Sequence, residues 1–94
     1  MLNSEHHVFS IHDEMTIYTA ADMREQLLLE LDKEGSMKID LLAITEFDTS
    51  GYQLLLACKR EAIARDKPIE ISNPSSVVSE VLDLYKDQSL ISQL

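Results

Sequence analysis

The four residues Asp48-Thr49-Ser50-Gly51 have the side chains and the spacing most suited to chemistry, and an apolar stretch follows them. Asp, Thr and Ser are preferred helix N-caps, because their side-chain oxygens accept hydrogen bonds from free helix amides. Glycine allows a sharp backbone turn and leaves a neighbouring hydroxyl uncrowded. A phosphate on that hydroxyl would meet the positive end of the helix dipole, beside the like charge of Asp48. The pattern predicts a helix cap and leaves phosphorylation open as a second use.

No other group of residues indicates catalysis or metal binding. The three histidines (His6, His7 and His12) lie near the N-terminus, without a second ligand cluster at a recognisable spacing. Cys58 is the only cysteine and stands in an apolar run, so we expect a buried small hydrophobe. There is no glycine-rich phosphate loop and no Gly-x-Ser-x-Gly motif. We predict a protein that is not an enzyme and has no resident metal or cofactor.

Length and composition predict one globular domain over residues 1–94. Hydrophobic residues make up 45% of the chain, which is enough for a packed core. The net charge of -9 argues against nucleic acid and anionic membrane surfaces as direct partners. No apolar stretch reaches the roughly 18–20 residues that span a membrane, and the N-terminus lacks a signal-peptide pattern. We therefore expect a cytoplasmic protein without direct membrane insertion.

The basic residues are clustered in the second half of the chain. Four of the eight fall within nine positions: Lys59, Arg60, Arg65 and Lys67. One interpretation is a solvated helix face and a helix C-terminus favoured by cations. The other is a docking patch for an acidic partner.

Hydrophobic periodicity predicts strands alternating with helices. The predicted strands are 7–11, 15–18, 37–44 and 69–71, the first two separated by a turn at 12–14. The predicted helices are 20–34, 51–65 and 76–87. Thr19 is expected to cap the first helix and Gly35 to end it in the left-handed conformation. On the other two helices, the residues expected to face inward are Leu55, Cys58, Ala62, Val78, Val81, Leu82 and Tyr85.

The order β-β-α-β-α-β-α predicts an α/β fold. Strands that alternate with helices imply a mostly parallel or mixed four-stranded sheet, with right-handed crossovers that pack three or more helices on it. In such sheets, sites form where strand C-termini meet helix N-termini. Residues 45–51 lie at a junction of this kind.

The STAS domain family has a central segment that resembles residues 39–62 of this chain, IDLLAITEFDTSGYQLLLACKREA. Its pattern is an apolar strand, then Asp, Ser or Thr, a small residue and Gly, and then a leucine-rich helix. The similarity extends to residues 15–31, MTIYTAADMREQLLLEL, and 67–84, KPIEISNPSSVVSEVLDL. The resemblance covers nearly the whole chain and implies a stand-alone bacterial STAS domain, similar to anti-sigma-factor antagonists.

The resemblance assigns roles to the Asp48–Gly51 turn. In the switching members of the family, a partner kinase of the anti-sigma type phosphorylates the hydroxyl directly after the Asp. That position is Thr49 here, with Ser50 as the alternative acceptor, while Asp48 and Gly51 match the acidic residue and the glycine of the motif. Tyr52 replaces the more usual leucine, either as a partner anchor or as a partly buried ring. Lys59 and Arg60 extend the partner surface that these residues are expected to form.

The resemblance implies a non-enzymatic signalling protein switched by phosphate on Thr49. Its partners would be an anti-sigma-factor or serine/threonine-kinase-like protein, or another ATPase, with a phosphatase of the PP2C type as a further candidate. One alternative is a constitutive subunit that binds the ATPase of a phospholipid-transport ABC system. Another is a STAS adaptor in a chemotaxis or two-component pathway.

Overall fold

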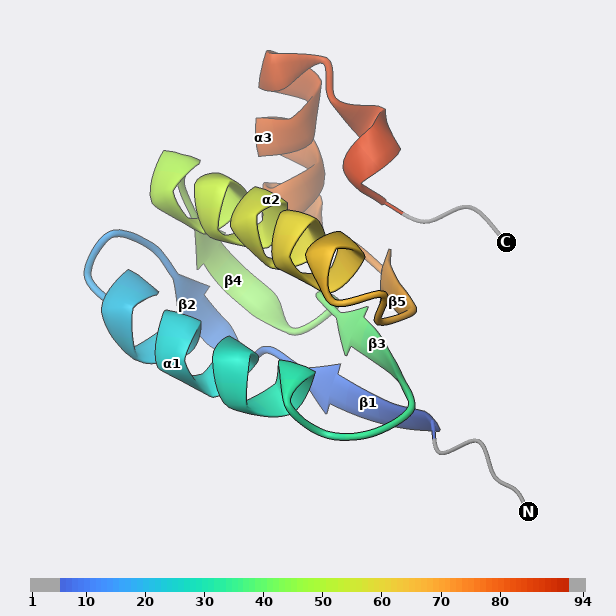
Figure 1. The fold of residues 1–94 in the computed structure, drawn as a ribbon. Coiled ribbons are helices and arrows are strands. Elements are labelled where there is room, and N and C mark those ends of the chain that lie inside the picture. Colours follow the sequence, from blue (N-terminus) through green and yellow to red (C-terminus); the bar gives the residue numbers. More distant parts are fainter. Residues whose placement is uncertain (1–5, 92–94) are drawn as a thin grey trace.

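The computed structural model describes residues 6–91 of the chain. Figure 1 shows strands and helices that alternate along most of this part. The strands are β1 (His6–Ser10), β2 (Asp13–Met15), β3 (Ser36–Asp40), β4 (Ile44–Phe47) and β5 (Ile69–Ser72). The helices are α1 (Ala20–Leu31), α2 (Thr49–Ala64) and α3 (Ser76–Tyr85), followed by a short 3-10 helix, η1 (Gln88–Leu90).

The described strands pair in parallel. β3 lies between β1 and β5 in a three-stranded sheet, with His6 opposite Ser36 and Met37 opposite Ile69. β2 and β4 form a second, two-stranded sheet. Since β1 leads directly into β2 and β3 into β4, each pair is one strand path with a break in the middle. The predicted parallel α/β fold is therefore confirmed, with five strands in place of the expected four.

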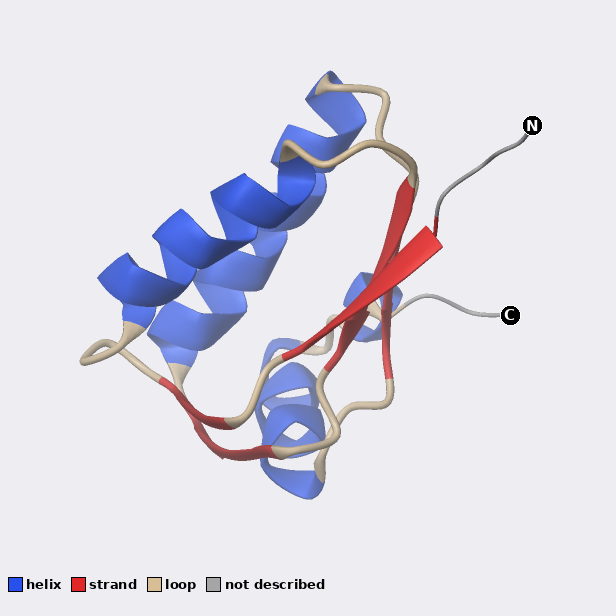
Figure 2. Ribbon diagram, turned by 90° about the horizontal axis from the view of Figure 1, so that it is seen from below, coloured by secondary structure: helices blue, strands red, loops and turns tan. Residues whose placement is uncertain are grey.

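Two of the three α-helices in the described chain form a layer on the sheet, and the third lies apart from them (Figure 2). α1 and α2 lie together on one face of the three-stranded sheet, while α3 lies beside β4 (Figure 2). The core between these layers holds Met37 and Ile39 from β3 and Leu55 from α2, which are inaccessible to solvent. As predicted, Cys58 and Ala62 also face inward. This packing places the start of α2 at the edge of the core, next to β2.

The predictions of a second strand at residues 15–18 and of a turn before it at 12–14 are wrong. Residues 13–15 form β2, and the chain turns after Met15. Asp13 adopts the left-handed conformation (φ 65°), and the register between β2 and β4 shifts directly after it. Asp tolerates this conformation better than most residues, so the strand path bends there and continues.

The expected strand 37–44 is interrupted after Asp40. The Asp40 Oδ1 atom accepts a hydrogen bond from the Leu42 backbone N–H (3.0 Å), and the Ile44 N–H donates to the Leu41 carbonyl (3.3 Å). An Asp side chain that bonds the backbone two residues on produces a turn. Pairing resumes in β4, which brings the strand to Phe47, directly before Asp48 and the start of α2.

Several helix ends differ from the predictions. α1 ends at Leu31, so Gly35, which is left-handed as expected (φ 88°), lies beyond the helix in the connection to β3. Thr19 stands at the N-cap position of α1, but its side chain makes no capping hydrogen bond. α3 ends at Tyr85, which is 46% exposed and therefore not the core residue that its helical spacing suggested.

Over residues 6–91, no helix has both the length and the apolar character that crossing a membrane requires.

Candidate functional site at the start of helix α2

Asp48 caps α2 and also binds a second segment of the chain. Its backbone is extended, and its Oδ1 atom accepts hydrogen bonds from the N–H groups of Ser50 (2.9 Å) and Gly51 (3.2 Å). Its Oδ2 atom accepts a third from the Ile17 N–H (3.1 Å). The predicted cap is confirmed for Asp48, whereas Thr49 and Ser50 already belong to the helix. One carboxylate therefore joins the start of α2 to the loop between β2 and α1.

Gly51 lies where any larger residue would collide with the neighbouring strands. It sits in the first turn of α2 with a helical backbone, so the expected sharp turn at this glycine is wrong. A Cβ atom there would overlap the Met15 carbonyl oxygen and come within 2.8 Å of a Phe47 ring carbon. The absence of a side chain therefore allows the first turn of α2 to pack directly against β2 and β4.

Thr49, the predicted phosphorylation site, is exposed at the first position of α2. Its hydroxyl lies 2.7 Å from the hydroxyl of Tyr85, at the end of α3. Ser50, the alternative acceptor, is half-buried. Exposure therefore favours Thr49 over Ser50 as the hydroxyl that another protein could reach.

Tyr52 and Tyr85 form a stacked pair beside Thr49. Their ring centroids are 4.6 Å apart and their planes differ by 3°. The Tyr52 hydroxyl donates to Asp87 Oδ2 (2.6 Å), which raises the pKa of Tyr52 above its ordinary value. Donation by Ser89 and by Tyr52 lowers the pKa of Asp87. Tyr52 is half-buried, and its hydroxyl is bound to the segment after α3.

The four clustered basic residues have separate roles. Lys59 Nζ donates to the Ser89 carbonyl (3.0 Å), and Arg60 is exposed on the same helix. Arg65 pairs with Glu61 (2.9 Å) and with Asp32 at the end of α1 (2.7 Å). Lys67 Nζ donates to the carbonyls of two residues in the connection from α1 to β3, Lys33 and Gly35. Within the described chain, these contacts make most of the cluster structural and leave Arg60 as its most open member.

The loop between β2 and α1 contributes two residues that the sequence did not indicate. Ile17 is 66% exposed and Tyr18 is 90% exposed, although both fall in the expected strand 15–18. Thr16 holds this loop: its N–H donates to Thr19 Oγ1 (3.0 Å) and its hydroxyl accepts from the Tyr18 N–H (3.2 Å). The contact that brings the loop to Asp48 spans 31 positions, and no local pattern predicts it.

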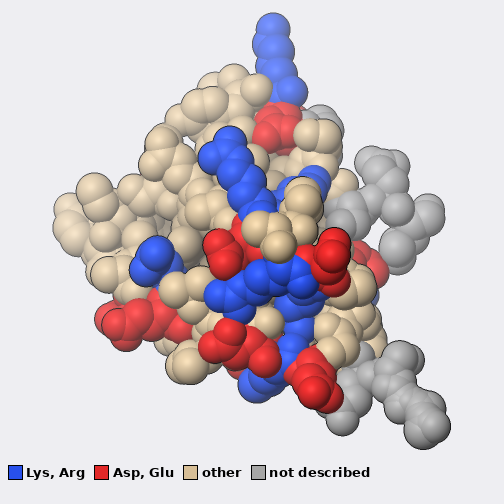
Figure 3. All heavy atoms as spheres, viewed as in Figure 1, with Lys and Arg blue, Asp and Glu red and all other residues tan. Residues whose placement is uncertain are grey.

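Charged side chains are unevenly spread over the face shown in Figure 3. Groups of both signs alternate over its centre, where the helices run side by side, while much of the side toward the start of α2 carries uncharged residues. Asp48, Thr49, Ser50, Gly51 and Tyr52 come together at this end, and the structure adds Ile17, Tyr18 and Tyr85. We name these eight residues, of which Gly51 is buried, the α2-start surface. It combines exposed apolar and aromatic groups with the exposed aliphatic hydroxyl of Thr49.

The histidines and the cysteine have no arrangement that suggests a reaction centre. His6 Nδ1 lies 2.7 Å from Ser36 Oγ and His7 Nε2 lies 3.1 Å from Glu30 Oε1, so both are engaged with neighbouring elements. Among residues 6–91, no three His, Cys, Asp or Glu side chains are grouped so that they could hold a metal ion.

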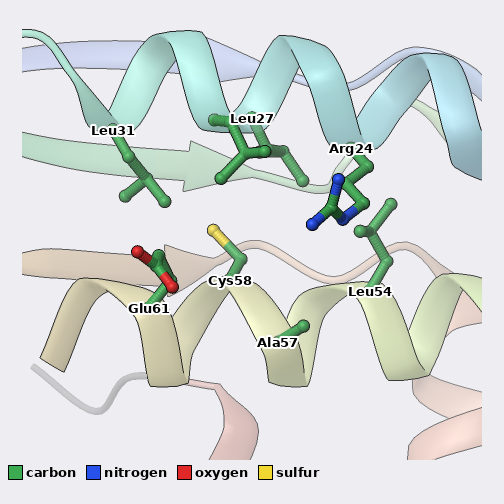
Figure 4. Close-up of a pocket in the computed structure, with 8 residues that line it drawn as sticks. Arg24, Leu27, Leu31, Leu54, Ala57, Cys58 and Glu61 are labelled. Carbon is green, nitrogen blue, oxygen red and sulfur yellow. The ribbon is translucent and has the colours of Figure 1, made fainter. Parts of the chain in front are cut away.

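A small hollow of about 80 Å³ lies between α1 and α2. The Cys58 thiol points toward α1 there, near Leu27 and Leu31 (Figure 4). Burial raises the pKa of this thiol to about 11, and the expected buried cysteine is confirmed. The hollow lies farther along the helices than the α2-start surface and contributes nothing to it.

Known proteins identify the family. A family model described as "Mlab, STAS domain" matches residues 2–91, and the chain therefore belongs to the STAS domain family. A solved structure of the anti-sigma factor antagonist SpoIIAA in its unphosphorylated form superposes with a TM-score of 0.74. The two are 19% identical, and the match covers 100% of this chain and 84% of that one.

A second solved structure has the same fold. It is a sulfate transporter family protein from Wolinella succinogenes, 11% identical, with a TM-score of 0.71 over 93% of this chain and 71% of that one. At such identities both likenesses concern the fold alone. No curated protein matches the chain.

Proposed function

We propose that this chain is a non-enzymatic regulatory protein, similar to anti-sigma-factor antagonists, that binds a kinase-type, ATP-binding partner through the α2-start surface. Phosphorylation of Thr49 switches the interaction. The observation that carries the proposal is the exposed Thr49 hydroxyl at the first position of α2, directly after the capping Asp48. Family membership and the shared fold with SpoIIAA support it.

The physical effect of a phosphate at this place favours release of a partner. The Asp48 carboxylate already occupies the N–H groups of Ser50 and Gly51, so those two amides are not free to bind a phosphate. A phosphate adds a charge of about -1.5 to -2 at neutral pH, beside that carboxylate. Desolvating this pair of like charges against a partner is unfavourable. The unmodified form is therefore the binding form.

A fixed subunit is the second candidate function. The Thr49 hydroxyl bonds Tyr85, so this residue has a role that needs no phosphate. The description of the matched family model names Mlab together with the STAS domain. In this alternative the α2-start surface binds the ATPase of a phospholipid-transport ABC system permanently. A STAS adaptor in a chemotaxis pathway would use the same surface.

Mass spectrometry on the chain from its native cells, combined with a pull-down from the same lysate, tests these functions. Phosphate on Thr49, with a kinase-like protein bound to the unmodified form alone, is the result expected for the switch. A phosphatase of the PP2C type that removes the phosphate would complete it. An unmodified Thr49 with an ABC-type ATPase bound in every sample would overturn the switch in favour of the fixed subunit.

Two pairs of variants sharpen the test. Thr49→Asp should lose the partner and Thr49→Ala should keep it, because the partner responds to the charge. Ser50→Asp and Ser50→Ala are the matched controls, one position along the same helix. Equal partner binding by Thr49→Asp and Thr49→Ala would contradict the switch, and a loss confined to Ser50→Asp would move the site to Ser50.

A further inference from the structure

A chain of side-chain contacts leads from the Thr49 hydroxyl to the segment after α3. The hydroxyl bonds Tyr85, the Tyr85 ring stacks on Tyr52, and the Tyr52 hydroxyl donates to Asp87. Asp87 in turn accepts a hydrogen bond from the Ser89 hydroxyl (2.6 Å). We call residues 86–91 the C-terminal turn. The path consists of three hydrogen bonds of 2.7 Å or less and the stacked ring pair.

The C-terminal turn has several further attachments to the domain. Lys59 holds the Ser89 carbonyl, the Asp87 N–H donates to the Leu82 carbonyl (3.0 Å), and Leu90 is 1% exposed in the core. Lys86 is left-handed (φ 52°), a conformation that only a minority of non-glycine residues adopt. The position of this turn thus depends on several contacts, one of which is the bond from Tyr52 to Asp87, with the Tyr85 ring stacked on Tyr52.

We propose that the contact between Tyr85 and Thr49 acts as a latch that holds the C-terminal turn in place. Phosphorylation of Thr49 breaks this contact and loosens the turn. This inference rests on the phosphorylation of Thr49 in the proposed function, and it adds a second surface whose state reports the modification. Release of the partner would then follow from the altered turn as well as from the charge of the phosphate.

The steric argument starts from the 2.7 Å between the two hydroxyl oxygens. A phosphate on the Thr49 oxygen adds a phosphorus atom and three further oxygens directly beside this contact, and Thr49 can no longer donate to Tyr85, so we expect Tyr85 to be displaced. The nearly parallel rings cannot slide far without losing their contact. Because Tyr85 is the last residue of α3, its displacement acts directly on Lys86 and on the bond between Tyr52 and Asp87.

The test uses the full chain made by chemical synthesis with phosphothreonine at position 49, compared with the unmodified chain. Hydrogen exchange measured by mass spectrometry should be about tenfold faster in peptides covering 82–91, as expected for the loss of one hydrogen bond and one ring contact. Protection in peptides from β3 and α1 should not change. Equal exchange in 82–91, or a loss of protection across the whole chain, would overturn the latch.

Tyrosine fluorescence gives a second, independent measurement. The chain has three tyrosines and no tryptophan, so a Tyr18→Phe background leaves emission from Tyr52 and Tyr85 alone. Phosphate on Thr49 should raise this emission, because the stack and the carboxylate contact that quench it are lost. A chain phosphorylated at Ser50 is the matched control, with the same charge and no effect expected. Equal changes from both phosphates would contradict a latch specific to Thr49.

Two substitutions separate the hydroxyl contact from the ring contact. Thr49→Val and Tyr85→Phe each remove the 2.7 Å hydrogen bond and retain the stacked rings, so both should accelerate exchange in 82–91 less than the phosphate does. An acceleration as large as that of the phosphate would contradict the steric step.

The outcomes also distinguish this inference from the proposed function. A Thr49 that is unmodified in cells would overturn the proposed switch, although the synthetic phosphorylated chain would still show the coupling. Unchanged exchange and emission in that synthetic chain would overturn the latch and leave the switch standing.

Discussion

The Asp48 side chain accepts a hydrogen bond from the Ile17 backbone N–H (3.1 Å), although the two residues are 31 positions apart in the chain. The other oxygen of the same carboxylate caps α2. The motif Asp therefore fixes the start of the helix and, at the same time, the loop that exposes Tyr18. A binding surface composed of both parts depends on this one side chain.

Asp48→Asn should separate these two roles. An asparagine side chain has one acceptor oxygen, so it can cap α2 or accept from Ile17, but it cannot replace both carboxylate oxygens. Since Asn is a good N-cap, we expect the cap to be kept and the Ile17 contact to be lost. Hydrogen exchange at the Ile17 amide should then become faster.

Asp48→Ala is the matched variant for this comparison. It removes the cap as well and should lower the free energy of unfolding by about 1–2 kcal/mol, more than Asp48→Asn does. Urea denaturation gives the difference. An Ile17 amide that exchanges equally in the wild type and in Asp48→Asn would show that the loop does not depend on this carboxylate.

Gly51→Ala should destabilise the protein even though alanine favours helices. In an open helix position the change would contribute about 1 kcal/mol of stability. Here the new Cβ atom meets the Met15 backbone and the Phe47 ring, so we expect a net loss of about 1–3 kcal/mol in urea denaturation. Ala57→Gly, at an exposed position of α2, is the control and should cost about 1 kcal/mol through propensity alone. A more stable Gly51→Ala protein would refute the close approach.

The Cys58 thiol should make stability fall at alkaline pH. Its folded-state pKa, about 11, is above the ordinary 9.0, so the native state retains a proton that the unfolded chain loses. The contribution is complete below about pH 9 and disappears as the pH rises toward 11. Its size should be of the order of 2 kcal/mol.

Urea denaturation at pH 8 and pH 10.5 measures this effect. The fall in the free energy of unfolding should be smaller in Cys58→Ala than in the wild type, while Tyr52, whose pKa is also raised, contributes to both. Iodoacetamide should label the thiol slowly in the native protein and rapidly in urea. Rapid labelling of the native protein would contradict the buried position.

Lys59 and Arg60 should respond differently to substitution. Arg60→Glu should slow the association with an acidic partner several-fold at low salt and leave the stability unchanged, because an exposed charge acts mainly on the association rate. Lys59→Met retains the aliphatic stem and should instead speed hydrogen exchange at Ser89 and Leu90, since it removes the bond to the Ser89 carbonyl. An association rate unaffected by Arg60→Glu would exclude Arg60 from the partner surface.

Helical periodicity predicted the inner face of α2 well. Leu55, Cys58 and Ala62 recur at helical spacing and are buried, because packing against the sheet selects one side of a helix. The same rule was wrong for Tyr85. Its spacing matches Val78 and Leu82, but it is the last residue of α3 and extends past the core to Tyr52. Periodicity identifies a face and does not show where the opposing layer stops.

The strand breaks were harder to predict, since they depend on single backbone positions. The apolar run 37–44 conceals the turn at Asp40, although an Asp followed two residues later by a free N–H is a known turn former. The capping role of Asp48 followed from local chemistry. The partners that complete the candidate site, Ile17 and Tyr85, come from distant segments, and only the assembled fold brings them to Asp48 and Thr49.

The parallel pairing of every described strand has a consequence for how this chain folds. β1 meets β3 through residues such as His6 and Ser36, which are 30 positions apart, and no hairpin joins neighbouring strands within residues 6–91. The first ladder bond therefore requires closure of a loop of about thirty residues, with its entropic cost, before any sheet energy is gained. We expect a high relative contact order and slower folding than that of helical bundles of equal length, with α1 and α2 forming before the strands pair.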